Sequence, residues 1–335
     1  MEDNITKIEA ARREYADWCS AVGIDNIERL NAVLSDGGAI RLINLCEARQ
    51  ERKYAEIANQ IFWHRKKTRI VMMSGPSSSG KTSSALRIAQ QCNVLGITPK
   101  VIELDNYFVD REHTPKDENG EYDFEALGAM NVSLLNEQLN DLVEGREITV
   151  PKYDFKSGKS VFDDSRRMKL EENDMLFMEG IHALNPDLTP GVDRSRIFNV
   201  YISALSALPG GTKVHGSTTD KRLLRRIVRD SRVRGISPEE NILRWPSVRR
   251  GETRNIFPYE ENARVVFNSS TLYDLPLLKY YAEPLLYGVT EASPAYGKAQ
   301  DLLKFIEPVT ALRPAEIAAI PPTSIMREFI GGQTL

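Results

Sequence analysis

The sequence predicts an α/β protein in which a doubly wound parallel sheet is flanked by helices. Short apolar runs recur along the chain, and stretches with apolar residues at helical spacing fill the intervals between them. This alternation is typical of a parallel sheet, whose strands are joined by crossover helices. The first apolar run also leads directly into a glycine-rich loop, at the edge where open α/β sheets hold their ligands.

The glycine-rich loop follows an apolar strand at residues 69–74 and has the form G-x-x-x-x-G-K-[ST]. Its glycines let backbone N–H groups face a polyphosphate, its lysine reaches the β and γ oxygens, and its threonine can ligate Mg²⁺. A helix predicted from Thr82 to Cys92 would point its positive end at the same phosphates. The strand before and the helix after argue against a chance match in a Gly/Ser-rich turn. The motif predicts a P-loop NTPase fold with these nucleotide-binding residues: Gly75, Ser77, Ser78, Ser79, Gly80, Lys81, Thr82 and Ser83.

Further strands are predicted wherever an apolar run is bounded by polar residues. Two of them end on an acid, Asp105 and Glu179, and would carry these carboxylates to the edge that holds the loop. The polar segment 106–131 is predicted to be a loop over the active site. The predicted strands after the first are 100–105, 174–179, 196–203 and 264–268.

The helices follow from apolar spacing at 132–143 and from an arginine-rich stretch at 220–234. Residues 148–155 and 161–162 predict a small β-hairpin excursion with Ser157-Gly158 at its turn. Residues 1–66 are predicted to be a helical N-terminal appendage with no recognisable chemistry. Residues 67–335 would form the domain that carries the loop, ending in a proline-containing helical extension that docks on the core through Ile325, Phe329 and Ile330.

The arginine-rich helix is unusually basic for a chain with a net charge of −3. Arg222, Arg225, Arg229 and Arg232 recur at i+3 and i+4 and would share one face. A solvated basic face is one interpretation. The other is a phosphate-facing lid, because arginine forks suit phosphate geometry.

Composition sets the broad class of protein. With 335 residues and 41% apolar residues the chain can bury a substantial core. A net charge of −3 and a pI near 6.0 argue against binding to nucleic acid or to an acidic membrane surface. Three cysteines without paired spacing and no signal peptide suggest a reducing compartment, and no run approaches the roughly 18 apolar residues of a membrane span. We therefore expect a cytoplasmic protein with a small-molecule substrate, and a homo-oligomer stays open.

The acidic residues decide between classes of nucleotide-binding protein. GTPases carry an N-K-x-D motif that reads guanine, and the sequence has none. An acid beside the loop, Asp105, followed by Tyr107 and Phe108, favours a small-molecule kinase, because a carboxylate there can take the proton of an acceptor hydroxyl. A structural acid that caps the next element is the alternative.

A set of motifs in this order and spacing over residues 68–270 resembles the uridine kinase/phosphoribulokinase family of P-loop kinases. The set most resembles the bacterial nucleoside-kinase branch in which the kinase half follows regions similar to the front of threonyl-tRNA synthetase. The motifs are Gly75-Pro-Ser-Ser-Ser-Gly-Lys-Thr82, Leu104-Asp-Asn-Tyr-Phe108, Tyr122-Asp123, Pro151-Lys-Tyr-Asp-Phe155, Phe177-Met-Glu-Gly180 and the stretch 219–230.

The resemblance implies roles for individual residues. Asp105 would be the general base, and it would hold Mg²⁺ together with Thr82 and Glu179. Lys81 would act on the transferring phosphoryl group. Asp123 and Arg222 would bind the ribose hydroxyls, and Tyr153 and Phe155 would form the walls of the base pocket. The lid that closes on the phosphates of ATP would consist of Arg225, Arg229 and Arg234.

Two positions depart from the uridine kinase pattern. At the position where a histidine reads the pyrimidine in uridine kinases, this chain has Gly158. His182 resembles the pattern of the phosphoribulokinase branch of the family and could contact substrate. The resemblance implies ATP- and Mg²⁺-dependent transfer to the 5′-hydroxyl of a nucleoside, uridine or cytidine first. The alternatives are a sugar or sugar-phosphate kinase, and a regulatory nucleotide-binding module without turnover.

Overall fold

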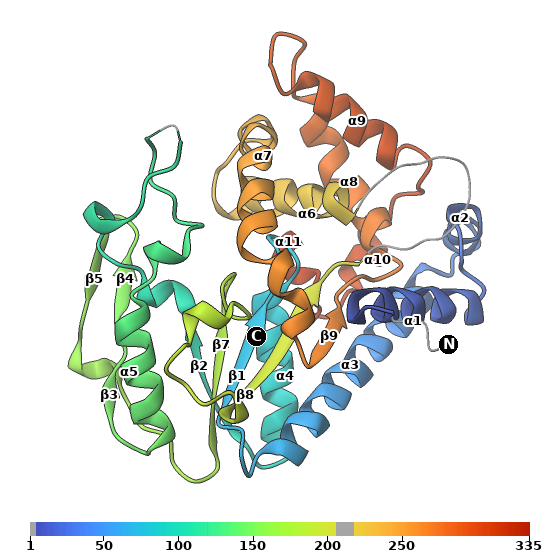
Figure 1. Ribbon diagram of the computed structural model, residues 1–335. Helices are drawn as coiled ribbons and strands as arrows, with labels where there is room; N and C mark the ends of the chain where they lie inside the picture. The colour runs from blue at the N-terminus through green and yellow to red at the C-terminus, as the bar shows by residue number, and fades with distance from the viewer. Residues whose placement is uncertain (1–4, 119, 206–217) are drawn as a thin grey trace.

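The computed structural model describes residues 5–118, 120–205 and 218–335, and its centre is a five-stranded parallel sheet (Figure 1). The strand order β2-β7-β1-β8-β9 places the first strand in the middle, as a doubly wound sheet requires. All five predicted strands are present, which confirms the fold class. They are β1 (Ile70–Ser74), β2 (Thr98–Glu103), β7 (Asp174–Glu179), β8 (Ile197–Ser203) and β9 (Val265–Asn268).

Helices cover both faces of the sheet because its central strands alternate between two cores. Ile70 and Met72 of β1 join the cluster that contains Leu135 and Leu139 of α5. Val71 and Met73, the residues in between, join the cluster formed with α3 and α4. The helices are α1 (Lys7–Ala21), α2 (Ile27–Ser35), α3 (Ala39–His64), α4 (Lys81–Val94), α5 (Val132–Val143), α6 (Thr218–Val233), α7 (Pro238–Asn255), α8 (Asp274–Tyr287), α9 (Tyr296–Ile306), α10 (Pro314–Ala318) and α11 (Arg327–Ile330).

A third cluster joins the two ends of the chain. Leu30, Ile43 and Cys46 from α2 and α3 pack with Leu223 and Ile227 of α6 and with residues of α8 to α11. The helices predicted as an N-terminal appendage therefore share a core with the helices that follow the sheet. The division of the chain into domains at residue 66 stays a prediction.

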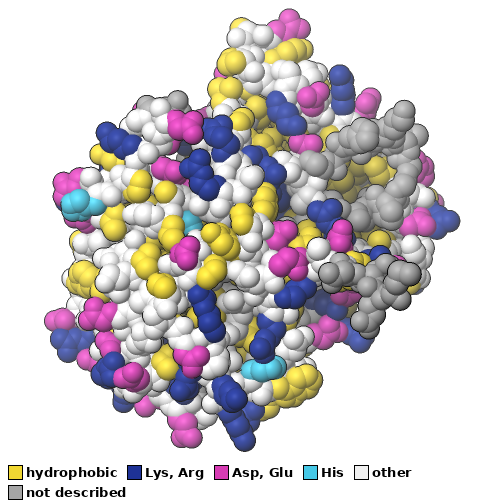
Figure 2. All heavy atoms as spheres, viewed as in Figure 1, with side chains coloured by type: hydrophobic (Ala, Val, Ile, Leu, Met, Phe, Trp, Pro, Cys, Tyr) yellow, Lys and Arg dark blue, Asp and Glu magenta, His cyan; other side chains and the backbone are white. Residues whose placement is uncertain are grey.

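The segments that leave the sheet are short. The predicted hairpin is present as β4 (Lys152–Asp154) paired with β5 (Lys159–Val161), and β3 (Ile148–Thr149) pairs with β6 (Arg167–Met168). No helix in the described part of the chain combines the length and the apolar character that a bilayer crossing requires. On the face drawn in Figure 2, basic and acidic side chains are interspersed.

Candidate active site

The loop after β1 is shaped for a ligand. Ser78 has a φ of 58° and Gly80 a φ of 82°, the left-handed region that glycine adopts without strain. No side chain caps the first turn of α4, which begins at Lys81, so its N–H groups face the loop. The Lys81 ammonium donates to the carbonyl of Pro76 at 3.3 Å. The loop thus offers backbone and ammonium donors to an anion.

A cavity of about 290 Å³ surrounds this loop and gathers most of the predicted site. Two of the predicted loop residues do not line the cavity: Gly75, which directly follows β1, and Ser83, which turns away as described below. Charged side chains from six other parts of the chain complete the wall. The predicted residues that line it are Ser77, Ser78, Ser79, Gly80, Lys81, Thr82, Asp105, Glu179, Arg229 and Arg234.

The two predicted metal-site acids lie beside the threonine of the loop. Thr82 Oγ1 donates to Glu179 Oε1 at 2.8 Å. Burial raises the pKa of Glu179, as does the charge of Asp105, while Lys81 opposes the rise. The Asp105 side chain is open to the cavity, but protein atoms surround it on its other sides. This desolvation raises the pKa of Asp105, and the positive charge of Lys81 opposes the rise. Asp105 lies in a short turn after β2 and not at the strand's last residue as predicted.

The donor set fits Mg²⁺. Mg²⁺ is held in such sites by one or two carboxylates together with substrate phosphates, and not by a cage of protein ligands. No group of three or more His, Cys, Asp or Glu within the described ranges could hold a metal by itself. Thr82, Asp105 and Glu179 supply hard oxygen atoms beside the loop that would hold the phosphates.

Helix α6 turns a different set of arginines to the loop than predicted. Arg226, which the sequence reasoning left out, lines the cavity and donates to the Ser77 hydroxyl at 2.9 Å. Arg229 lines it as well and pairs with Asp230 at 2.8 Å. Arg234, just past the helix, is exposed at the cavity wall. Closure of these residues as a lid stays a prediction.

Two of the predicted arginines lie elsewhere, and these are corrections. Arg222 is buried, donates to the Ser77 carbonyl at 2.8 Å and pairs with Glu252, so it supports the loop and does not lie with Asp123. Arg225 is fully buried and pairs with Asp274 at 2.6 Å, outside the cavity. Neither side chain lines the cavity that would hold the ligand we assigned to it. Arg232 faces Tyr281, so the four arginines do not form one functional face.

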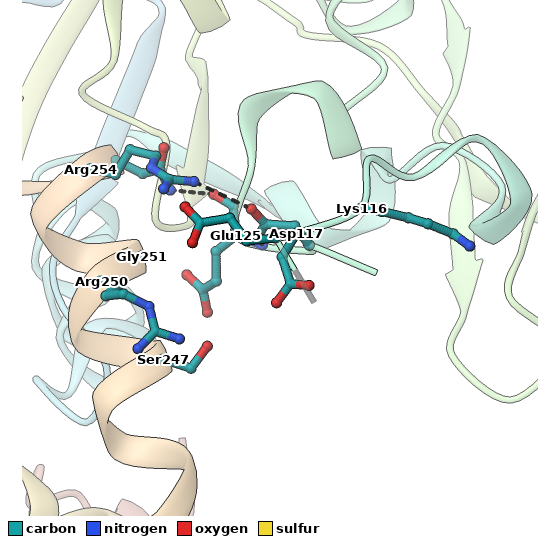
Figure 3. Close-up of a pocket in the computed structure, with 10 residues that line it drawn as sticks. Lys116, Asp117, Glu125, Ser247, Arg250, Gly251 and Arg254 are labelled. Carbon is teal, nitrogen blue, oxygen red and sulfur yellow. Dashed lines mark hydrogen bonds and ion pairs between the residues drawn. The ribbon is translucent and has the colours of Figure 1, made fainter. Parts of the chain in front are cut away.

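A second cavity of about 160 Å³ adjoins the first through Glu125, which lines both (Figure 3). Asp123 lies here, 3.7 Å from Arg254. Arg250 and Arg254 reach into it from α7, opposite the acids. Burial raises the pKa of Glu125 to about 7, and the charges of Glu252 and Asp123 contribute while Lys81 opposes. This cavity therefore offers both acceptors and donors to a polar molecule.

The predicted base-walling residues form an aromatic cluster next to Asp105. The ring of Phe108 lies 5.4 Å from Tyr153 and 6.1 Å from Phe155, both edge to face. The Tyr153 hydroxyl is buried and makes no hydrogen bond to the described residues. Tyr153 and Phe155 are thus joined through Phe108 to the turn that carries Asp105, but they do not line either cavity.

The two positions that depart from the uridine kinase pattern are both accounted for. Gly158 has a φ of +70° at the hairpin turn, and a side chain there would collide with Arg111 at 2.8 Å. His182 is buried, and burial lowers its pKa to about 4, so it is neutral at pH 7. Its ring nitrogens make no hydrogen bond of ordinary geometry within the described residues, although the backbone of Glu125 and Ala126 lies beside the ring. His182 supports the segment that carries Asp123 and does not reach a cavity.

Four charged residues of the first cavity were missed by the sequence reasoning. Arg226 could have been found, since it lies one helical turn from both Arg222 and Arg229. Glu125 could also have been found, because it lies two residues after Asp123. Two others, Glu252 and Glu328, come from distant helices and carry no local signal.

The matches with known proteins agree with this geometry. A family model described as "Phosphoribulokinase / Uridine kinase family" matches residues 70–275. A uridine kinase of Macrococcus caseolyticus (strain JCSC5402) is 30% identical over 185 residues, which are 55% of this chain and 79% of that protein. A uridine kinase of Staphylococcus aureus (strain JH9) is 30% identical over 186 residues, with the same shares covered.

A solved structure described as a possible uridine kinase from Bacillus stearothermophilus is 21% identical and covers 63% of this chain and 99% of that one, with a TM-score of 0.39. So low a TM-score adds nothing to the family match. These findings support the kinase part of the predicted resemblance, and they give no support to a fusion with regions similar to threonyl-tRNA synthetase.

Proposed function

Because the chain belongs to the phosphoribulokinase/uridine kinase family, we propose that it transfers a phosphoryl group from ATP to the 5′-hydroxyl of a nucleoside, with pyrimidine nucleosides the first candidates. One observation carries the proposal: the loop cavity and the Asp123 cavity adjoin, and Asp105 lies in the wall of the first. A donor held by the loop and an acceptor held at Asp123 would meet beside this carboxylate.

The residues of the loop cavity would divide the chemistry between them. Asp105 would take the proton of the acceptor hydroxyl, and Lys81 would stabilise charge on the transferring group. Mg²⁺ would neutralise the phosphoryl oxygens when bound. Thr82 and Glu179, already joined by a hydrogen bond, would hold it with Asp105.

The acceptor side offers groups for a ribose and for a base. Carboxylates accept from vicinal hydroxyls, and Asp123 lines the cavity in which a ribose would lie. Tyr153 and Phe155 would wall the base by stacking if the acceptor extends to the aromatic cluster. Because the turn at Gly158 has no side chain to read a base edge, we expect more than one base to be accepted.

A sugar or sugar-phosphate kinase is the second candidate, and one observation favours it. Arg250, Arg254 and Lys116 line the same cavity as Asp123, which would suit an acceptor that already carries an anionic group. A nucleotide-binding module without turnover would have no use for a base at Asp105.

A panel of nucleosides and pentose phosphates assayed for ADP release separates these candidates. The proposal expects turnover with nucleosides and about 10²-fold or more less in the Lys81→Ala variant, which controls for contaminating kinases. Turnover with pentose phosphates alone would favour the second candidate. No turnover with any acceptor, in a protein that still binds ADP, would contradict both.

A further inference from the structure

The C-terminal segment of the chain lies against the phosphate-binding loop. The family match ends at residue 275, and α11 with the residues after it lies 50 or more positions further on. Ile325, Phe329 and Ile330 are buried, which confirms the predicted docking, and the C-terminus lies near the middle of the molecule (Figure 1). A segment outside the family match thus reaches the candidate active site.

Its contacts fall on the first turn of α4. The Ser83 hydroxyl donates to Glu328 Oε2 at 2.5 Å, and Gln333 Nε2 donates to the Ser83 hydroxyl at 2.7 Å. A Cβ atom at Gly80 would lie 2.3 Å from Ile325 Cδ1. The segment is therefore packed directly on the loop, and no side chain other than hydrogen fits between them.

Glu328 is the residue of this segment that lines the loop cavity. Its Oε2 accepts from Ser83, and its Oε1 has no hydrogen bond or ion pair to the described residues. An ionised carboxylate only accepts hydrogen bonds, and it repels phosphate. A nucleotide in this cavity presents O–H or N–H donors only on its ribose and its base, so these are the groups that Glu328 could serve.

The direction of α4 places Glu328 away from the reacting end. Consecutive residues on an α-helix point about 100° apart. Thr82 faces Glu179, in the group of acids that would hold the metal, whereas Ser83 faces Glu328. Lys81 reaches the β and γ phosphates in loops of this type, so the part of the cavity beside Glu328 is left for the rest of the nucleotide.

We propose that Glu328 is a specificity-determining residue for the phosphoryl donor. Its free carboxylate oxygen accepts a hydrogen bond from a ribose hydroxyl or from the amino group of the base, and the C-terminal segment holds it in place. This inference rests on the proposed use of an adenine nucleotide by the loop cavity. It gives the C-terminal segment, which lies beyond the matched family region, a function in recognising the phosphoryl donor.

The test is equilibrium binding by calorimetry, with Mg²⁺ present, of four nucleotides: ADP, 2′-deoxy-ADP, 3′-deoxy-ADP and the diphosphate of purine riboside, which lacks the amino group. In wild type, the analogue that lacks the hydrogen-bond donor recognised by Glu328 should bind about tenfold or more weaker than ADP. This is the scale of a hydrogen bond to a charged group. The analogue that loses affinity tells a ribose contact from a base contact. In Glu328→Ala, ADP should weaken to the level of that analogue, and the difference between the two should disappear.

Two further variants separate recognition from docking. Glu328→Gln keeps an acceptor for Ser83 but loses the charge, and should show an intermediate selectivity. Gln333→Ala removes a docking contact to the same serine without touching the cavity, and should leave the ratio of ADP to analogue affinity unchanged.

Unchanged selectivity in Glu328→Ala, or an equal loss of selectivity in Gln333→Ala, would overturn the inference while the turnover assay still supported a kinase. If wild type bound no adenine nucleotide at all, the proposed function would fail and the inference with it.

Discussion

Helix α6 has basic residues on two sides, and the two sides meet opposite surroundings. Arg226 and Arg229 line the loop cavity and remain partly accessible. Lys221 and Arg225 are buried and both pair with Asp274, at 3.1 and 2.6 Å. Burial raises the pKa of Asp274, but the two cations more than offset this and hold it below its usual range.

The difference teaches how to separate a structural charge from a functional one. In the buried group two cations share one carboxylate, so the loss of that carboxylate would leave both cations without a charge partner in the core. The cavity side has cations whose remaining donors face a space of ligand size. Charges on the cavity side should therefore govern turnover, and charges on the buried side should govern the free energy of unfolding.

The largest effect is expected at Lys81, the cation nearest the reacting group. Lys81→Ala should lower kcat by about 10² to 10³, the usual loss when one donor to a developing charge is removed. The melting temperature should stay close to that of wild type, because the ammonium makes one hydrogen bond within the loop. A variant with wild-type turnover would break the assignment of the cavity side.

On the buried side, Asp274→Asn should destabilise the protein by about 3–5 kcal/mol in chemical denaturation, because two buried cations lose their charge partner. Asp25→Asn is the matched control: its pair with Arg29 is at the surface, and its loss should cost about 0.5 kcal/mol or less. Equal stabilities of the two variants would remove the distinction between buried and accessible charges.

Arg226→Ala and Arg229→Ala sharpen the comparison within one helix. Each should lower kcat/KM for ATP by about tenfold, the loss of one charge-assisted hydrogen bond to phosphate. Arg232→Ala, on the same helix but over the Tyr281 ring, is the control and should leave kcat/KM unchanged. If all three variants behaved alike, the basic side facing the loop would be a solvated surface.

The smallest expected effect is a pH dependence from Glu125. Its pKa is raised from 4.5 to about 7 in the folded protein, so between these values the folded state keeps a proton that the unfolded chain has lost. Its contribution to stability is therefore highest below pH 4.5 and falls as the pH rises toward 7. Glutamine is neutral at every pH, so the free energy of unfolding of Glu125→Gln relative to that of wild type should be lower at pH 5 than at pH 7.5. Parallel pH profiles would show that Glu125 titrates normally.

The sheet and the loop could be predicted from the sequence because their signals are local. An apolar run such as 174–179 predicts a buried strand by itself, and the spacing from Gly75 to Thr82 specifies the loop. The hairpin turn at Gly158 was predicted for the same reason, and its left-handed φ fits it.

The side of α6 that meets the loop could not be predicted in this way. Arginines at i+3 and i+4 share a face, but which neighbours that face meets depends on where the loop after β1 and α8 pack against it. Arg225 lies opposite Asp274, a residue 49 positions further along the chain. Glu252 and Glu328 likewise reach the cavity from helices with no motif of their own.

The central claim is that this chain is a kinase with Asp105 as its base, and single-turnover kinetics of Asp105→Asn test it most directly. Asparagine keeps the size of the side chain but cannot take a proton, so the rate of phosphoryl transfer to the best acceptor should fall by about 10² or more. ADP affinity measured without Mg²⁺ should change little, because the loop amides and Lys81 supply most of it. A transfer rate within a fewfold of wild type would contradict the claim and leave Asp105 a structural acid.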